Sequence, residues 1–228
     1  MPVDLAPLLQ LHNRFPQRAL WRLTPAGIAI GAGAAIGTPG DPLTVLRVWG
    51  WFAAPIRASA AAYGVPVELI VAAICSESAG GETDLNVVVT SRREEPGYRS
   101  DAATPDRVSV GCMQTLLSSA SEAVGHTVTA AELVDPAVSI DAGARIIANA
   151  AGATGLDPPL VAAAYNAGGL YLDTPTANRW GLVCYPSGTG RYIDESVAWF
   201  NDAMRVSSAD PTLAGAAPSF ARDMAAAA

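Results

Sequence analysis

The stretch Ala72-Ala-Ile-Cys-Ser-Glu-Ser78 ends a helical stripe of apolar residues, and it decides the fold of this chain. The stripe has the i, i+3, i+4, i+7 spacing of one helix face and consists of Val67, Ile70, Val71 and Ile74. Glu77 and Ser78 continue the same face. A carboxyl group on a core-facing stripe loses hydration, so we expect a raised pKa for Glu77.

A carboxylic acid that is still protonated near neutral pH can donate a proton to a leaving group. The alternative is a Glu at the solvent-facing end of a core helix, which is the usual place for a charged side chain. Two downstream segments favour the catalytic alternative, Gly111-Cys-Met-Gln114 and Ala164-Tyr-Asn-Ala-Gly168, and Tyr192 follows them.

In this order, the segments resemble the lytic transglycosylases, lysozyme-like enzymes that cut the glycan strands of peptidoglycan. That family has a Glu-Ser pair at a helix end, then Gly-Leu-Met-Gln, then Ala-Tyr-Asn-Ala-Gly, then a Tyr before the last helix. The resemblance covers roughly residues 51 to 206. It implies a mainly α fold of the α+β lysozyme-like superfamily, with a helical bundle around a substrate cleft and a partly extended N-terminal region.

The chain departs from the family pattern at two places. Cys112 stands where the family usually has Leu or Ala, a swap between apolar side chains that we expect to be tolerated. The segment between Glu77 and Gly111 is longer than in compact members, with a charged insertion at residues 91–107. Long loops are often functional, so we expect this insertion near one wall of the cleft.

The resemblance makes Glu77 the catalytic general acid and then general base. It implies cleavage of the β-1,4 bond between N-acetylmuramic acid and N-acetylglucosamine through an oxocarbenium-like state. The muramoyl C6 hydroxyl, in place of water, would then close a 1,6-anhydro ring. The substrate-binding residues that the motifs predict are Ser78, Gly111, Met113, Gln114, Tyr165, Asn166 and Tyr192.

Each binding residue has an expected role beside a structural alternative. Ser78 is expected to hydrogen-bond near Glu77 or to cap a backbone group, and Gly111 to let the backbone approach the sugar. Met113 is an apolar wall of the cleft or plain core, and Gln114 orients Glu77 or binds a sugar amide.

The remaining binding residues belong to two helix ends. Tyr165 and Asn166 supply a phenol and an amide for an acyl-amino sugar. Asn166 and Gly168 are also typical helix caps. The Tyr192 hydroxyl is expected to reach Glu77.

Two alternatives to a transglycosylase stay open. A muramidase that hydrolyses the same bond with inversion needs a second carboxylate roughly 6.5–9.5 Å from the first, for which Asp101 and Asp106 are the candidates. A phage tail or baseplate protein could instead use the fold to grip glycan without cutting it.

The composition favours a packed protein and excludes several partners. The 228 residues are 50% hydrophobic and 15% charged, and the net charge of −7 argues against nucleic-acid binding. The cysteines are too few for a disulfide scaffold, and we expect buried free thiols at Cys75 and Cys112. His12 and His126 are far apart, so we expect no metal site and no cofactor.

The N-terminus has no secretion signal pattern, and the apolar segment at residues 26–37 is too short to span a bilayer. A phage-encoded protein would fit this pattern: it is made in the host cytoplasm and reaches the periplasm and cell wall as an endolysin or within a virion. The expected partners are peptidoglycan strands and other phage tail or virion proteins, with no membrane insertion.

We expect three regions: an N-terminal extension and docking element at 1–42, the enzyme-like domain at 43–206, and a loosely held Ala-rich tail at 207–228. The extension should hold a short helix near Leu5–Asn13 and a strand pair near 21–33. Caps should open helices at Thr129, Asp135 and Asp157.

Overall fold

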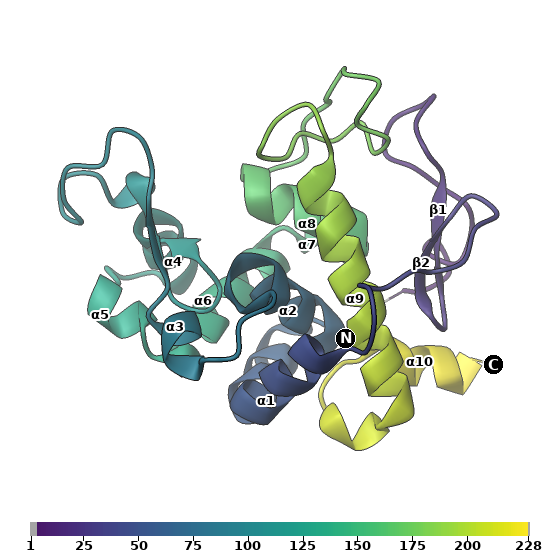
Figure 1. The fold of residues 1–228 in the computed structure, drawn as a ribbon, viewed down its shortest axis with the longest axis horizontal. Coiled ribbons are helices and arrows are strands. Elements are labelled where there is room, and N and C mark those ends of the chain that lie inside the picture. The colour runs from purple at the N-terminus through teal and green to yellow at the C-terminus, as the bar shows by residue number, and fades with distance from the viewer. Residues whose placement is uncertain (1–3, 228) are drawn as a thin grey trace.

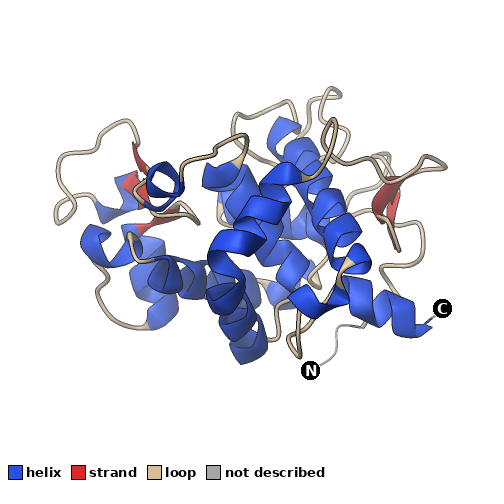
Figure 2. Ribbon diagram, turned by 60° about the horizontal axis from the view of Figure 1, so that its bottom comes forward, coloured by secondary structure: helices blue, strands red, loops and turns tan. Residues whose placement is uncertain are grey.

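The computed structural model describes residues 4–227. Helices form most of this part of the chain, beside two small sheets, which confirms the mainly α, lysozyme-like fold (Figure 2). The helices are α1 Leu43–Tyr63, α2 Val67–Ile74, α3 Leu85–Val89, α4 Leu117–Val124, α5 Ala130–Leu133, α6 Pro136–Asn149, α7 Ala151–Thr154, α8 Pro158–Ala167, α9 Arg191–Ala209 and α10 Phe220–Ala227. Shorter turns are η1 Cys75–Ala79, η2 Pro105–Arg107 and η3 Pro211–Leu213. The strands are β1 Trp21–Thr24, β2 Gly27–Ile30, β3 Arg92–Glu94, β4 Val108–Val110 and β5 Thr115–Leu116.

Helix α2 lies at the centre of the main core and packs against α1, α8 and α9 (Figure 1). Seven of its eight residues are buried, because it is apolar on nearly every side. Helix α9 carries the predicted stripe of Ile193, Val197, Phe200 and Met204, all buried, against α2 and α8. The end of α2 and the start of α9 are therefore held by the most densely packed part of the molecule.

A second, smaller core forms around the antiparallel sheet β3-β4-β5, on the left of Figure 1. Val108 and Val110 of β4 pack there with Leu117 of α4 and Leu133 of α5. This sheet contains the start of the charged insertion: β3 is an exposed edge strand, and η2 comes just before β4.

The local signals for helix starts and kinks are mostly confirmed. Thr129 and Glu132 form the predicted capping box of α5, and the Asp135 side chain accepts the Ala137 N–H at the start of α6. Helix α1 is kinked at Phe52, three residues before Pro55. Asp157 is the exception, because its side chain does not cap α8.

The N-terminal segment pairs with itself and with the core. The predicted strand pair is confirmed as β1–β2, which packs on α9 through hydrogen bonds between Asn201 and the backbone of Ile28. The predicted helix near Leu5–Asn13 is wrong: a turn at Leu5 is followed by a bridge between His12 and Trp21. Backbone pairing with β1 takes the hydrogen bonds that a helix would have used.

The prediction of a loosely held C-terminal tail is wrong for the described residues. Helix α10 buries Phe220 and Met224 against the main core. Its first turn is held by Glu68 of α2, a fully buried carboxyl group that accepts hydrogen bonds from Ser219 Oγ and the Phe220 N–H. Sequence composition gave no sign of this contact, because its partners are 151 residues apart.

The three cysteines, Cys75, Cys112 and Cys184, are buried free thiols, as expected for the first two. None of the helices within residues 4–227 combines the length and apolarity that crossing a bilayer requires.

Candidate active site

Glu77 lies in a π-helical turn, η1, that directly continues α2. The turn has one residue more than an α-helical turn, and such turns are common at functional sites. Ser76 secures it, since its Oγ donates to the Ala72 carbonyl at 2.9 Å and lies 3.0 Å from Ser196 Oγ of α9. The α-helical periodicity of the sequence did not predict this turn.

The environment of Glu77 makes its carboxyl group a weak acid. Burial raises its pKa from the ordinary 4.5 to about 7, although the side chain remains partly exposed. The hydrogen bond from Tyr192 and the positive charge of Arg93 hold the pKa of Glu77 below the value that burial alone would produce. Near neutral pH, Glu77 therefore exists in both its protonated and its charged form.

Two tyrosines from different helices lie beside this carboxyl group. Tyr192, in the first turn of α9, donates its hydroxyl hydrogen to Glu77 Oε1, which confirms that its side chain reaches Glu77. Tyr165, near the end of α8, is close enough that the charge of Glu77, together with burial, raises the pKa of its phenol. The motifs at 77, 165 and 192 thus meet in space.

The segment Gly111–Gln114 lies between the sheet and this cluster, with its carbonyl groups turned toward it. Ser78 Oγ donates to the Cys112 carbonyl at 2.7 Å, and Tyr165 Oη donates to the Met113 carbonyl at 2.8 Å. Of the two roles expected for Ser78, the structure shows the backbone contact. These two bonds fix the segment against the helices that carry Glu77 and Tyr165.

The side chains of this segment face inward. A Cβ on Gly111, whose φ is +82°, would lie 2.2 Å from the Leu133 carbonyl, so this glycine serves packing against α5 rather than approach to a sugar. Met113 is fully buried and fills the space over Gly143, so its side chain belongs to the core and lines no surface.

Gln114 closes the turn between β4 and β5. Its Nε2 donates to the carbonyls of Ser91 and Gly111, both at 2.9 Å, and its Oε1 accepts from Ser109. Its positive φ of 46° is held by these three contacts. The expected contact with Glu77 is absent from the described hydrogen bonds, because both amide groups already have partners in the turn.

Asn166 connects α8 to the long loop that follows. Its Oδ1 accepts the backbone N–H of Tyr185, and its amide nitrogen has no hydrogen-bond partner within residues 4–227. The helix cap is Gly168, at φ +70°, so only one of the two predicted caps is confirmed. The partly exposed amide of Asn166 can therefore still donate to a ligand.

The two candidates for a second carboxylate have other partners. Asp101 accepts from Arg92 at 2.7 Å and from Tyr98 at 2.8 Å, and exposed Asp106 pairs with Arg107 at 3.2 Å. Within the described residues, the charged side chain that acts on Glu77 is the cation Arg93 on the edge strand β3. Sequence reasoning missed Arg93, which stands among other charges in the insertion.

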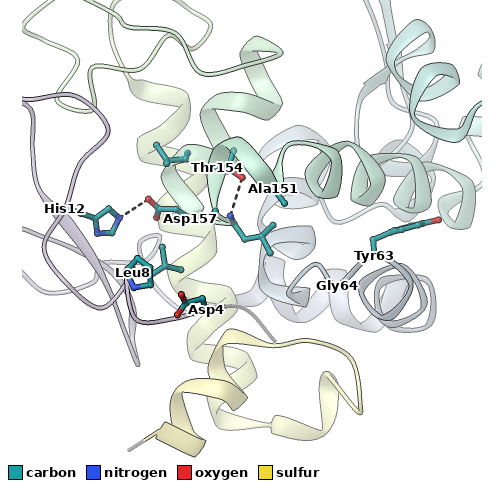
Figure 3. A pocket seen from close by; sticks show the side chains of 12 residues that line it. Asp4, Leu8, His12, Tyr63, Gly64, Ala151, Thr154 and Asp157 are labelled. Atoms are coloured by element: carbon teal, nitrogen blue, oxygen red, sulfur yellow. Dashed lines mark hydrogen bonds and ion pairs between the residues drawn. The ribbon is translucent and has the colours of Figure 1, made fainter. Parts of the chain in front are cut away.

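The described residues contain no group of three or more His, Cys, Asp or Glu side chains arranged to hold a metal ion. A cavity of about 640 Å³ lies away from Glu77, between the N-terminal segment and the start of α8 (Figure 3). Buried Asp157 lies at its wall and binds His12 Nε2 and Trp21 Nε1, both at 2.9 Å. None of the predicted site residues lines this cavity.

Comparison with known proteins gives one family. The model described as "Transglycosylase SLT domain" matches residues 54–179, more than half of the chain. The matched range includes Glu77, Gln114 and Tyr165, and it ends before Tyr192. A search of curated proteins found no match.

Proposed function

The chain belongs to the transglycosylase SLT domain family, and we propose that it cleaves peptidoglycan with Glu77 as its single catalytic carboxyl group. Membership implies peptidoglycan degradation of the lytic transglycosylase type. The bond we propose is the β-1,4 link between N-acetylmuramic acid and N-acetylglucosamine. The raised pKa of the partly buried Glu77, caused by its loss of hydration, is the observation that supports this proposal most.

Glu77 acts first as an acid. At pH values below about 7 its carboxyl group is mainly protonated. It donates this proton to the glycosidic oxygen while the C1–O4 bond breaks, and a cation develops on the sugar ring. The N-acetyl group of the substrate can stabilise that cation, so no protein nucleophile is required.

Glu77 then acts as a base. The carboxylate left by the first step is stabilised by the Tyr192 hydroxyl and by the charge of Arg93. It takes the proton of the muramoyl C6 hydroxyl as O6 bonds to C1, which closes the 1,6-anhydro ring. Glu77 ends protonated and no water is consumed, so the enzyme is ready for another cycle.

The surroundings of Glu77 favour this reaction over inverting hydrolysis. A hydrolase of that kind needs a second carboxylate to activate water. Among the described residues, the two acidic candidates of the insertion are bound to Arg92 and Arg107, and the charge that acts on Glu77 is positive.

We place the sugar near the end of α8. Asn166 has a free amide nitrogen beside Tyr165, whose ring adjoins Glu77. An N-acetyl carbonyl is an acceptor for such an amide, so Asn166 is our candidate for recognising the acylated amino sugar. Ser78, Gly111, Met113 and Gln114 support this arrangement through the backbone contacts of their segment.

The test is product analysis of purified peptidoglycan treated with wild type and Glu77→Gln. Wild type should release fragments ending in 1,6-anhydromuramic acid. Glu77→Gln should remain folded, because it keeps the shape of the side chain and an acceptor for Tyr192. It should lose activity by a factor of about 100 or more, since an amide cannot donate the proton. Activity within about threefold of wild type would rule out Glu77 as the acid.

Asp101→Asn and Asp106→Asn serve as matched controls and should stay within about threefold of wild type. Reducing ends as the only product, with a large loss in either variant, would instead identify a muramidase. The phage setting, as endolysin or virion component with other tail proteins as partners, stays a prediction that detection of the protein in purified particles would test.

A further inference from the structure

The loop between α8 and α9, residues 168–190, exposes two aromatic rings (green at the top of Figure 1). Tyr171 and Tyr185 are 56% and 62% exposed. Neither hydroxyl has a hydrogen-bond partner within residues 4–227. Two large rings that the fold leaves uncovered on one loop indicate a binding surface more often than single exposed side chains do.

Both tyrosines lie at the end of α8. The backbone N–H of Tyr185 donates to Asn166 Oδ1. The ring of Tyr171 folds back over Gly169, where a Cβ would meet it at 3.0 Å. The Tyr171 carbonyl also accepts the Val183 N–H at 2.9 Å, two residues before Tyr185, so both strands of the loop present their rings beside Tyr165 and Asn166.

The loop is held firmly by the N-terminal segment. The Arg18 guanidinium donates to the carbonyls of Asp173, Thr174, Pro175 and Asn178 at 2.9–3.3 Å. The fully buried Asn178 side chain donates to Asp173 Oδ2 and to the Leu182 carbonyl, both at 2.7 Å. A backbone fixed in this way presents its side chains at a low cost in conformational entropy.

We propose that Tyr171 and Tyr185 form a glycan platform, which stacks on pyranose rings of the strand beyond the disaccharide at the scissile bond. Sugar rings carry apolar C–H faces that pack on aromatic rings, and a long strand offers such faces at every residue. The platform adjoins Asn166, so one strand can reach both. Arg18 is a positioning residue, because it acts through the loop. This inference rests on the proposed function.

The experiment compares long glycan strands with a tetrasaccharide as substrates. In the double variant Tyr171→Ala/Tyr185→Ala, the ratio of kcat/KM for long strands to that for the tetrasaccharide should fall about tenfold. The loss should appear in KM for long strands, because the rings bind substrate without touching the reacting atoms. Arg18→Ala should lower the same ratio in the same direction, by a smaller factor.

Two control variants separate stacking from other effects. Tyr171→Phe/Tyr185→Phe keeps both rings and should retain the wild-type ratio within about twofold. Ile36→Ala removes another exposed apolar side chain, on the N-terminal segment, and should leave the ratio unchanged. An equal loss in the Phe and Ala pairs would show that hydroxyl contacts, and not ring stacking, are responsible.

The platform and the proposed function can fail separately. An unchanged ratio in an active Ala double variant overturns the platform, and the rings would then be free for a protein partner. If wild type cuts no glycan, the proposed function is wrong, and co-sedimentation with insoluble peptidoglycan decides the platform in the Glu77→Gln background. Equal sedimentation with and without the two rings would overturn the platform there as well.

Discussion

The hydrogen bond from Tyr192 to Glu77 sets the pH at which Glu77 can act. For the first step Glu77 must be protonated, so kcat/KM should fall as the pH rises through about 7. Tyr192 stabilises the charged form and keeps the pKa of Glu77 lower. Tyr192→Phe should therefore move this alkaline limb to higher pH, as a pH–rate profile of kcat/KM would show.

The direction of that shift distinguishes two roles of Tyr192. A tyrosine that only packs against Glu77 would leave the limb where it is. A limb that moves to lower pH would mean that the hydroxyl favours the protonated carboxyl group, contrary to the geometry. Tyr98→Phe, in the charged insertion, is the control and should leave the limb unchanged.

The same carboxyl group should weaken the fold at alkaline pH. Its folded pKa of about 7 lies above its ordinary 4.5, so stability falls as the pH rises from 4.5 through 7. Glu77→Gln does not titrate. It should match wild type at pH 4 and exceed it at pH 8 by on the order of 2 kcal/mol, after allowance for partial exposure. Urea unfolding at both pH values measures the difference. A constant gap would contradict the linkage.

Sequence patterns predicted which residues gather here better than what each one does. Glu77, Tyr165 and Tyr192 meet because each stands at a helix end that packing brings to one point. Gly111, Met113 and Gln114 have other roles than expected, because their contacts are to Leu133, Gly143 and Ser91. Those partners lie in separate segments, so no local pattern reveals them.

Helix α10 is attached to α2 through one buried carboxyl group. Glu68 accepts from Ser219 Oγ and from the N–H groups of Phe220 and Ala221. Glu68→Ala should leave these donors without partners in a buried site and lower the free energy of unfolding by about 2–4 kcal/mol. Chemical denaturation would measure it.

Asp223→Asn on the exposed side of α10 is the control and should change stability by less than about 0.5 kcal/mol. A loss that small for Glu68→Ala would show that apolar packing of Phe220 and Met224 holds the helix without the carboxyl group. A lower m-value in the Glu68 variant would indicate that α10 separates before the rest unfolds.

Elements with local signals were predictable, and elements that depend on distant partners were not. The capping boxes of α5 and α6 are formed by neighbouring residues, and the structure has both. The docking of α10 depends on Glu68, and the N-terminal turn depends on pairing with Trp21. In each of these two cases the tertiary contact decides the backbone, not the propensity of the segment.

The ends of the chain close around the enzyme-like domain. The N-terminal segment contributes His12, whose hydrogen bond to Asp157 is the main cause of its raised pKa. This bond replaces the expected cap of α8, since the Asp157 carboxylate is directed to His12 and Trp21. The division into an extension, a domain and a tail stays a prediction.

The attachment of the N-terminal segment should depend on pH. The folded pKa of His12 lies above its ordinary 6.5, so the stabilisation is complete below 6.5 and is lost as the pH rises through the folded value. In the Glu77→Gln background, unfolding free energy should fall over this range. His12→Asn should flatten the slope and exposed His126→Asn should not. Equal slopes in all three proteins would refute the pair.

The π-helical turn at Glu77 has a consequence at the level of the gene. A turn with one surplus residue corresponds to one surplus codon, and its loss would restore an unbroken α-helix. Such a deletion within codons 75–79 would rotate the residues beyond it by about 100° around the helix axis. The more regular helix would carry Glu77 away from Tyr192, so selection for activity alone is enough to retain this codon.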